Sequence, residues 1–457
     1  MNTAENRSEI SDTNWVRWIH FSDLHFKFKN YKTKELRQSL ENDIKNFGQF
    51  DYVVITGDIC HQGNYDKETV NFVKRLITLA GCQIENVIIS PGNHDAKRSR
   101  IRKVILDDII KEYFTHGESL KIPNEGRSVL INEPFEIFRN LYFEIKGVAP
   151  PSKLHYIANQ EACVINDKIN FIVLNTAVFS GQTYPNQPYL TKTDQDKENT
   201  NLFICEDELS ALTNNNSNLD TLNIVIAHHA VECFNNSEKK PFLNKLGQKL
   251  NTDLYLCGHS HKISLETIDE AKWQPIQVTC GGLFEDDYNQ PSFVTGEFNP
   301  NSGIVILTNY TYIKDRDTWS ASNAPHPYDE NGVYEYEPKR LKNLKKTAKS
   351  DDELIQLFSC LRNCLLDDSG FLSAVYPNCK NENLSVYQIV TIKDSYISKE
   401  FNTLKNDMGQ SDLILLSQIK DCYDISEKSE QEIKDNIEFA KILINKFLKT
   451  HIQWKLN

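Results

Sequence analysis

Over its first two thirds, the chain alternates short apolar runs with amphipathic stretches. The apolar runs are rich in Val and Ile and have the length of buried β-strands. Between them, apolar residues recur at i, i+3 and i+4, which is the spacing of an amphipathic helix. This alternation predicts an α/β domain over 14–314 that is built on largely buried sheets. The predicted strands include 15–21, 51–57, 86–90, 169–175, 222–227, 253–258 and 276–282, and the predicted helices include 32–47, 67–80 and 241–250.

Several stretches depart from this rhythm and indicate how the chain is divided. Residues 96–151 carry long helical patterns and predict a helical insertion or lid. The runs 293–298 and 303–313 predict a hairpin, so one sheet is expected to be mixed. Residues 315–334 are rich in Pro, Asn, Asp and Ser, which predicts a linker, and 335–457 then form a mostly helical C-terminal domain. Capping boxes in that domain are Ser350 with Glu353 and Ser429 with Glu432.

Charge and cysteine usage narrow the class of protein. The net charge of −12 argues against a protein that coats duplex DNA through bulk electrostatics. No apolar run approaches the roughly 18 residues of a membrane span, so no membrane partner is expected. The 11 cysteines form no CxxC pair and are odd in number, and the first residues show no signal-peptide pattern. These features predict a reduced, cytoplasmic protein.

Polar side chains follow five of the predicted strands, at the point where each strand ends. In open α/β sheets, ligands bind beyond the carboxyl ends of the strands. A single His or Asp at such a place is usually an ordinary loop residue, but five such coincidences together indicate one shared site. The residues are Asp23 and His25; Asp58; Asn93, His94 and Asp95; His228 and His229; and His259 and His261.

Oxygen and imidazole donors without thiolates suit manganese, iron or zinc. The ligands are too many for one four-coordinate ion, and two ions that share a carboxylate use them economically. Two divalent ions bring +4 and two aspartates bring −2, which leaves +2 for a hydroxide and an anionic oxygen substrate. Two metals about 3.5–4 Å apart can hold the attacking and departing oxygens of a phosphoryl transfer. The sequence therefore predicts a dinuclear metal site, with manganese as the first expectation.

These residues, in this order, resemble the calcineurin-like metallophosphoesterase superfamily. Its pattern is DxH, GD with a following Gly, GNHD or GNHE, a strand-ending His, and GHxH. The resemblance covers 14–314 and implies an α/β fold: a four-layer αββα sandwich of two mixed sheets flanked by helices. The matching residues are Asp23 and His25, Gly57 and Asp58 with Gly63, Gly92 to Asp95, His228, and Gly258 to His261.

The resemblance also implies roles for individual residues. One metal would be held by Asp23, His25, Asp58 and His261. The other would be held by Asp58, Asn93, His228 and His259, with Asp58 bridging the two. His94 would be the general acid in an attack by metal-bound hydroxide, and Asp95 would orient it. His228 is preferred to His229 because the family uses the first His of the pair. The candidates for substrate contact are Asn93, His229 and Arg98.

The substrate class stays open between several readings. The motifs look closest to class III cyclic nucleotide phosphodiesterases, but that branch generally lacks a helical C-terminal domain. A nuclease of the Mre11 and SbcD group is the alternative, because basic clusters lie at 96–103 and 338–346, although each could equally be a solvated helix face. A phosphomonoesterase or protein phosphatase is a third reading. A metal-bearing scaffold, like the phosphoesterase-fold subunit of retromer, is the non-enzymatic one. The C-terminal domain is the candidate surface for a protein partner.

The remaining histidines and cysteines have ordinary interpretations. Cys360 and Cys364 lie one helical turn apart on an apolar face and are expected in a core rather than at a metal. Four histidines are expected to be structural or on the surface, with the second of them the only candidate near the site: His20, His61, His116 and His155.

Overall fold

A computed structural model of the chain describes residues 15–26, 31–61, 63–116, 122–123, 126–158, 168–180, 202–212, 221–268, 274–284, 290–321, 325–343, 359–375, 384–404, 410–426 and 428–452. The chain divides into two compact units, Met1–Lys342 and Asn343–Asn457. Each unit is described by itself below.

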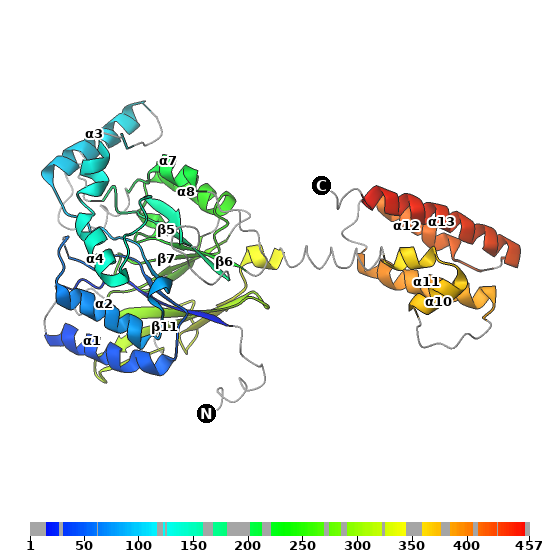
Figure 1. The fold of residues 1–457 in the computed structure, drawn as a ribbon, viewed down its shortest axis with the longest axis horizontal. Coiled ribbons are helices and arrows are strands. Elements are labelled where there is room, and N and C mark those ends of the chain that lie inside the picture. Colours follow the sequence, from blue (N-terminus) through cyan, green and yellow to red (C-terminus); the bar gives the residue numbers. More distant parts are fainter. Residues whose placement is uncertain are drawn as a thin grey trace. The chain divides into compact units, whose positions relative to one another are not determined.

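The first unit contains two mixed β-sheets (Figure 1). In the first, the strand order is β12-β11-β10-β1-β2-β3, and β13 also pairs with β11. Strands β1, β2 and β3 run parallel, whereas β10 is antiparallel to β1 and forms the predicted hairpin with β11. The bounds are β1 Val16–Phe21, β2 Tyr52–Ile55, β3 Val87–Ile89, β10 Ser292–Asn299, β11 Ile304–Ile313, β12 Thr318–Ser320 and β13 Val333–Tyr336.

The second sheet has the order β4-β5-β6-β7-β9-β8. Its four central strands are parallel, and an antiparallel strand lies at each edge. The bounds are β4 His155–Ile157, β5 Ile169–Leu174, β6 Leu222–Ile226, β7 Leu254–Cys257, β8 Ser264–Thr267 and β9 Ile276–Thr279.

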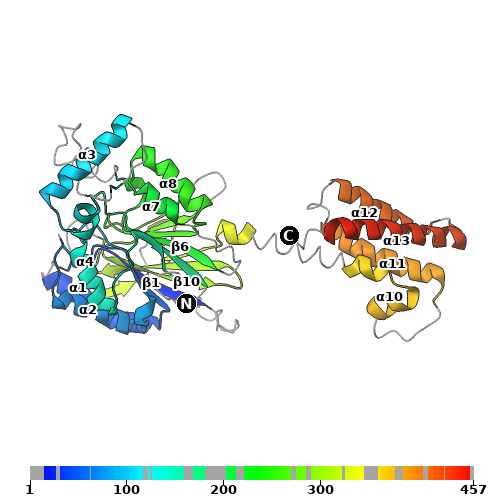
Figure 2. The same cartoon turned by 45° about the horizontal axis from the view of Figure 1, so that its top comes forward.

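Helices cover the outer faces of the two sheets (Figures 1 and 2). Alternation along β1 shows how the layers form: Trp18 joins the core between the sheets, whereas Ile19 joins the core under the helices. Helices α1, α2 and α4 pack on the first sheet, and α7 and α8 pack on the second. The predicted four-layer sandwich is therefore confirmed. The bounds are α1 Tyr31–Ile44, η2 Lys45–Phe47, α2 Lys67–Leu79, η3 Ile84–Asn86, α3 Arg100–His116, η5 Ser128–Asn132, α4 Glu136–Lys146, α7 Glu206–Ala211, η7 Val231–Cys233 and α8 Asn236–Gln248.

The predicted linker at 315–334 is wrong. Strands β12 and β13 begin within this stretch and extend the first sheet at β11, so the first unit continues to Lys342. Backbone hydrogen bonds from the N–H of Tyr328 to the Pro325 carbonyl and from the N–H of Gly332 to the Asp329 carbonyl form turns before β13. Trp319 is buried in the sheet–helix core. Strands β4 and β8 were not predicted either. They are short edge strands whose formation depends on pairing with a neighbouring strand. The predicted insertion at 96–151 holds α3, η5 and α4.

The second unit is a helical bundle with its own core. Cys360, Cys364 and Phe371 are buried in that core, which confirms the structural interpretation of the two cysteines. The capping box at Ser429 is present, because the Ser429 backbone N–H donates to Glu432 Oε2 at 2.8 Å. The one predicted at Ser350 and Glu353 lies outside the described residues. The bounds are α10 Asp368–Val375, α11 Val386–Leu404, α12 Gln410–Cys422 and α13 Glu430–Ile452.

Within the described ranges, a search for a helix with the length and apolarity of a membrane span found none.

Two of the histidines expected to be structural are indeed buried in the first unit. His20 Nε2 lies 2.9 Å from Thr56 Oγ1. His155 Nδ1 accepts a hydrogen bond from the Asn175 backbone N–H at 3.2 Å. Burial lowers the pKa of each imidazole to about 3. The side chain of the third, His116, lies outside the described residues.

The buried imidazole of His155 should make stability depend on pH. The pKa of His155 is lowered on folding, so its contribution is complete above the unfolded pKa near 6.5 and is lost as pH falls toward 3. Between pH 7 and pH 4.5 the protonation of this one group should lower the free energy of unfolding by about 2–3 kcal/mol. His155→Asn keeps an acceptor for Asn175 and removes the titration. Urea unfolding at both pH values should show that much less pH dependence in the variant, and equal pH dependence would contradict the assignment.

Candidate metal centre

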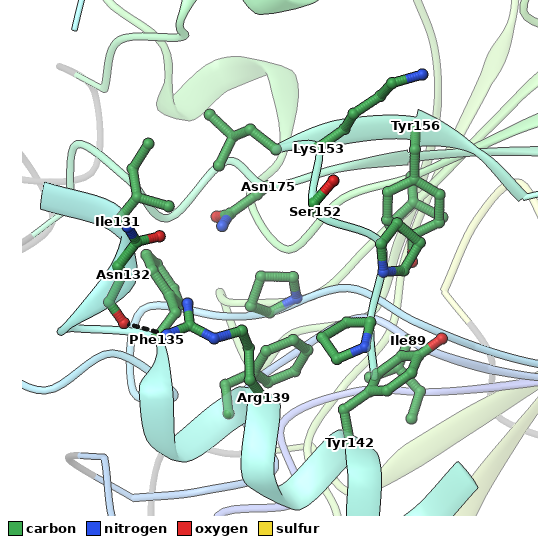
Figure 3. A pocket seen from close by; sticks show the side chains of 16 residues that line it. Ile89, Ile131, Asn132, Phe135, Arg139, Tyr142, Ser152, Lys153, Tyr156 and Asn175 are labelled. Atoms are coloured by element: carbon green, nitrogen blue, oxygen red, sulfur yellow. Dashed lines mark hydrogen bonds between the residues drawn. The ribbon is translucent and has the colours of Figure 1, made fainter. Parts of the chain in front are cut away.

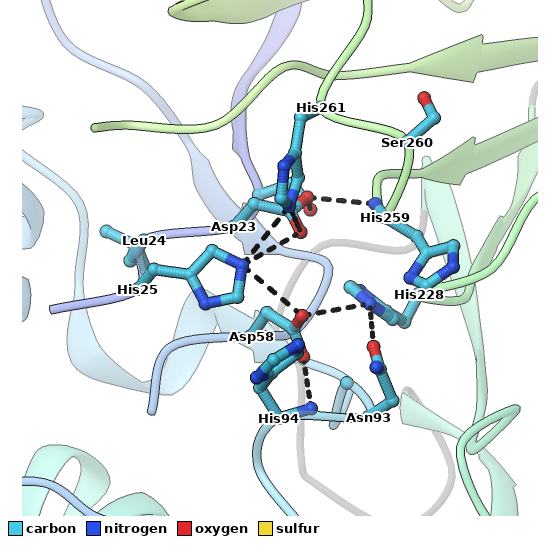
Figure 4. Close-up of polar contacts among 12 residues, drawn as sticks. Asp23, Leu24, His25, Asp58, Asn93, His94, His228, His259, Ser260 and His261 are labelled. Carbon is cyan, nitrogen blue, oxygen red and sulfur yellow. Dashed lines mark hydrogen bonds and ion pairs between the residues drawn. The ribbon is translucent and has the colours of Figure 1, made fainter. Parts of the chain in front are cut away.

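The carboxyl ends of the parallel strands from both sheets meet at one edge of the sandwich. Asp23 follows β1, Asp58 follows β2 and His228 follows β6, each within three residues of the strand end. A backbone hydrogen bond joins the two sheets there, from the Leu283 N–H after β9 to the Asp23 carbonyl at 3.1 Å. Residues separated by some 240 positions in the sequence thus lie side by side (Figure 4).

The backbone at this edge is held in an uncommon conformation. Seven non-glycine residues with positive φ occur in the described part of the chain, and five of them are predicted metal ligands. Left-handed backbone is disfavoured for residues with a Cβ and persists where surrounding structure imposes it, most often at functional sites. The loops are therefore shaped to aim side chains. The five residues are Asp23, His25, Asp58, His259 and His261.

Two glycines allow these loops to approach one another. A Cβ at Gly92 would collide with the backbone N and the carboxylate of Asp58. A Cβ at Gly258 would collide with Ser22 and with the carboxylate of Asp23. Glycine is needed at both positions because backbone from one strand end packs directly against a carboxylate from another.

The first group of ligand atoms converges on Asp23 Oδ1. His261 Nε2 lies 3.2 Å from this oxygen, and His25 Nε2 lies 3.7 Å from it. The two imidazole Nε2 atoms are themselves 3.2 Å apart, and His25 Nε2 is 3.5 Å from Asp58 Oδ2. The other Asp23 oxygen, Oδ2, accepts hydrogen bonds from Ser22 Oγ at 2.6 Å and from the His259 backbone N–H at 2.9 Å. The carboxylate is thus fixed with Oδ1 turned toward the imidazoles.

The second group lies on the other side of Asp58. His228 Nε2 is 3.3 Å from Asp58 Oδ2 and 2.9 Å from Asn93 Oδ1. His228 Nδ1 lies 2.7 Å from the Thr56 carbonyl, which can only accept, so Nδ1 carries a proton and donates. In the neutral ring Nε2 then has its lone pair directed at Asp58, as a metal ligand requires. The His259 ring packs against His228, with ring centroids 5.1 Å apart.

Part of the group has the protonation states of metal ligands, whereas the aspartates raise the pKa values of His228 and His261. Burial alone would raise the pKa values of Asp23 and Asp58, but the surrounding imidazoles lower both, so the carboxylates are ionised. Burial lowers the pKa of His25 to about 4 and that of His259 to about 3, so both are neutral. Burial opposes protonation of His228 as well, but the charges of Asp58 and Asp23 raise its pKa to about 9. A proton on His228 partly balances the charges of the two aspartates.

The donor set fits two divalent cations. Asp23 Oδ1 is buried and accepts no hydrogen bond, and it faces two imidazole nitrogens that also face each other. Such an arrangement of lone pairs is repulsive unless a proton or a cation lies between them. Ligand atoms that could hold an ion lie within 4.8 Å of one another in two sets that include a carboxylate: Asp23, His25 and His261; and Asp23, Asp58 and His228.

His94 lies beside both groups and has its backbone fixed by Asp58. Its backbone N–H donates to Asp58 Oδ1 at 2.7 Å. Its ring packs edge-on to His25 and stacks on His61, with centroids 4.8 and 5.2 Å away. Burial lowers the pKa of His94, and the charge of Arg98 acts in the same direction. His61 is thus placed at the site, as the sequence analysis allowed for this residue alone among the four.

The predicted role of Asp95 as the partner that orients His94 is wrong. Asp95 Oδ2 accepts from the backbone N–H groups of Asp58 and Gly92, both at 2.8 Å, and Oδ1 accepts from Cys60 at 2.7 Å. Burial and the Asp58 carboxylate raise the pKa of Asp95 to about 7, against the N–H donors that favour its charged form. Asp95 therefore joins the loops after β2 and β3. The sequence could not predict this role of Asp95, because its hydrogen-bond partners are backbone groups, which every residue has.

The predicted substrate-contact residues differ in accessibility. His229 is almost fully buried, and its Nδ1 lies 2.9 Å from Thr176 Oγ1. Its ring also lies against His259, with centroids 4.5 Å apart, so it supports the second ligand group from behind. Arg98 is exposed on the loop that follows Asp95.

Arg37 is a residue of this site that the sequence analysis missed. Its buried guanidinium donates to the carbonyl of Leu24 at 2.6 Å and to that of Leu283 at 3.2 Å. The same guanidinium lies over the Phe26 ring, 4.3 Å from the centroid. Arg37 thereby fixes the loop that carries Asp23 and His25. In the sequence it is one of several cations on an amphipathic helix, and only its burial distinguishes it.

A cavity of about 410 Å³ adjoins the site at the ends of β3 and β5 (Figure 3). Pro91 and Asn175 are shared between this cavity and the loops of the site, since Pro91 precedes Gly92 and Asn175 precedes Thr176. Helix α4 contributes aromatic side chains and Arg139, which donates to the Asn132 carbonyl at 2.5 Å. The cavity offers a mixed aromatic and polar lining beside the ligand groups.

Comparison with known proteins agrees with this geometry. Residues 16–263 match the family model described as calcineurin-like phosphoesterase. The chain is 25% identical over 449 residues to the uncharacterized metallophosphoesterase-like protein YydB of Bacillus subtilis (strain 168), covering 96% of this chain and 88% of that protein. Among solved structures, GAP50 of Plasmodium is similar with a TM-score of 0.35 and 13% identity over 73% of this chain and 94% of its own. Vps29 of Chaetomium thermophilum is similar with a TM-score of 0.28 and 12% identity, and the match covers 71% of this chain and 95% of Vps29. These two scores are too low to support a conclusion about function.

Proposed function

Since this chain belongs to the calcineurin-like phosphoesterase family, we propose that it is a dinuclear metal-dependent phosphoesterase that hydrolyses a phosphodiester. The observation that carries the proposal is the pair of ligand groups that share Asp58. Asp23, His25, Asp58 and His261 would hold one divalent cation, and Asp58, Asn93, His228 and His259 the other. The cations would supply a nucleophilic water at neutral pH and neutralise charge on the phosphate.

The chain's own residues would do the remaining work. His94 lies beside both groups and is partly exposed, so its ring can reach the oxygen of a leaving alcohol. A bound phosphate anion favours the imidazolium form that such a proton donor requires. Asp95 and Arg37 would hold the loops in place, and the packed His229 ring would keep His259 in position.

Two substrate classes are candidates for the phosphodiester, and a phosphomonoester stays as the third alternative. Cyclic nucleotides are suggested by the spelling of the motifs. Nucleic acid is favoured by the segment 97–103, where none of the five cations forms an ion pair in the described part of the chain. The second basic cluster gives no such support, because Arg340 forms a bidentate ion pair with buried Asp253 at 2.6 and 3.0 Å.

The experiment is a comparison of substrates on one preparation. Protein that has been stripped of metal with a chelator and reloaded with Mn²⁺ should bind two ions per chain. It should hydrolyse bis(p-nitrophenyl) phosphate faster than p-nitrophenyl phosphate. Cyclic AMP, single-stranded DNA and RNA, and duplex DNA tested in parallel would identify the substrate class. A metal-loaded protein that hydrolyses none of these esters would instead support a scaffold, and preference for the monoester would support a phosphatase.

A further inference from the structure

A basic pocket lies next to the site and has no assigned ligand. It has a volume of about 290 Å³ and is lined by Arg98, Ser99, Arg100, Arg102 and Lys103. With Lys97, five cations lie within seven residues in a chain whose net charge is −12. Unpaired cations concentrated at one place in an acidic protein create a local positive potential that attracts anions.

The local structure adds further positive charge to this pocket. Helix α3 begins at Arg100, and Ser99 caps it by accepting from the Arg102 backbone N–H at 3.1 Å. The positive end of the dipole of this 17-residue helix therefore lies in the pocket. Backbone N–H groups of the first turn and guanidinium groups are the usual ligands of phosphate oxygens.

Arg102 fixes the pocket and leaves one donor without a partner. Its guanidinium is buried and donates to the carbonyls of Val178 at 2.7 Å and Ser180 at 3.0 Å. Its Nε, which is also buried, has no hydrogen-bond partner. Arg102 therefore lines the pocket with one N–H donor for which the described part of the protein supplies no acceptor. Burial lowers the pKa of Arg102 to about 10, so it stays charged at neutral pH.

Two structural connections place the pocket close to the metal centre. Arg98 is four residues after His94, so their Cα atoms are within about 14 Å. Through Arg102, α3 also contacts the turn after β5, where Thr176 holds His229. A substrate with one phosphate at the metals can thus reach the pocket with another.

We propose that this pocket binds a second phosphate of the substrate, as found along a single nucleic-acid strand and absent from a cyclic mononucleotide. The inference rests on the proposed function for the position of the first phosphate. A single strand is favoured over a duplex because the chain has a net charge of −12, which opposes binding to the higher charge density of a duplex.

Charge reversal in the pocket tests this on the full-length, Mn²⁺-loaded protein. The variant is Arg100→Glu with Lys103→Glu, which leaves Arg98 and the buried Arg102 in place. The matched control is Lys45→Glu with Lys74→Glu, an equal charge change at exposed positions of η2 and α2. The probe is a fluorescent oligothymidine with hydrolysis-resistant phosphorothioate linkages, measured by anisotropy over a range of salt concentrations.

The pocket variant should bind the probe at least tenfold more weakly than the control variant. Its slope of log K against log salt should be smaller by about 0.7, for one lost contact to a single-stranded phosphate. Cyclic AMP should compete equally well in both proteins. Equal probe affinity and slope in the two variants would overturn the proposal, even where the protein hydrolyses phosphodiesters. Weakened probe binding in a protein that hydrolyses nothing would support the pocket and reject the proposed function.

Discussion

Asp58→Asn is expected to remove most of the catalytic activity and at least one metal ion. Asp58 Oδ2 faces imidazoles of both ligand groups, at 3.5 Å from His25 and 3.3 Å from His228. An amide cannot supply the negative charge that two cations share. We expect kcat on bis(p-nitrophenyl) phosphate to fall by roughly 10²–10³, the usual loss when one electrostatic stabiliser is removed. Metal content per chain, measured by mass spectrometry, should fall below two.

The same substitution at Asp329 provides the control. This carboxylate accepts backbone hydrogen bonds in a surface turn, from Asn331 and Val333, and Asn can replace it there. Asp329→Asn should keep both ions and full turnover. Unchanged metal content in Asp58→Asn would show that the two groups are not bridged through this residue.

His94→Ala is expected to keep both metal ions and lose most turnover. General acid catalysis contributes about 10²–10⁴ in rate, so the loss should fall in this range for a substrate with a poor leaving group, such as a dinucleotide. The loss should be much smaller for a p-nitrophenyl ester, because its leaving oxygen needs little help from a proton. Comparing the two substrates in the same variant separates proton transfer from general damage.

The alternative for His94 has a distinct signature. Ring nitrogens of His25, His61 and His94 lie within 4.8 Å of one another and could also hold an ion. If His94→Ala loses metal, and both substrates slow equally, then His94 is a ligand rather than the proton donor.

The sequence predicted the buried elements of the fold far better than its edges. Strands such as β6 and β7 are short, wholly buried and largely apolar, so their pattern alone identifies them. Strands β12 and β13 have three and four residues in a stretch rich in turn formers, and only pairing with β11 makes them strands. Pairing with a distant edge leaves no local pattern to detect.

The residues of the site also fall into a part that the sequence predicted and a part that it did not. Its ligand residues follow strand ends in a recognisable order, and the structure gathers them. Their supports could not be predicted, because Arg37, Asp95 and Arg102 act on backbone carbonyls or N–H groups, which every residue possesses. Arg340 shows the opposite case: it looked like part of a basic surface but neutralises buried Asp253.

The hydrogen bonds of Asp95 have a mechanical consequence. The Asp95 carboxylate accepts hydrogen bonds from the backbone N–H groups of Asp58 and Gly92. Asp58 is the proposed bridging ligand, and Gly92 lies two residues before His94. The proposed bridging ligand and the proposed proton donor are therefore held by the same carboxylate and should shift together. In the proposed mechanism, an effector that displaces Asp95 would therefore disturb metal binding and proton donation at the same time.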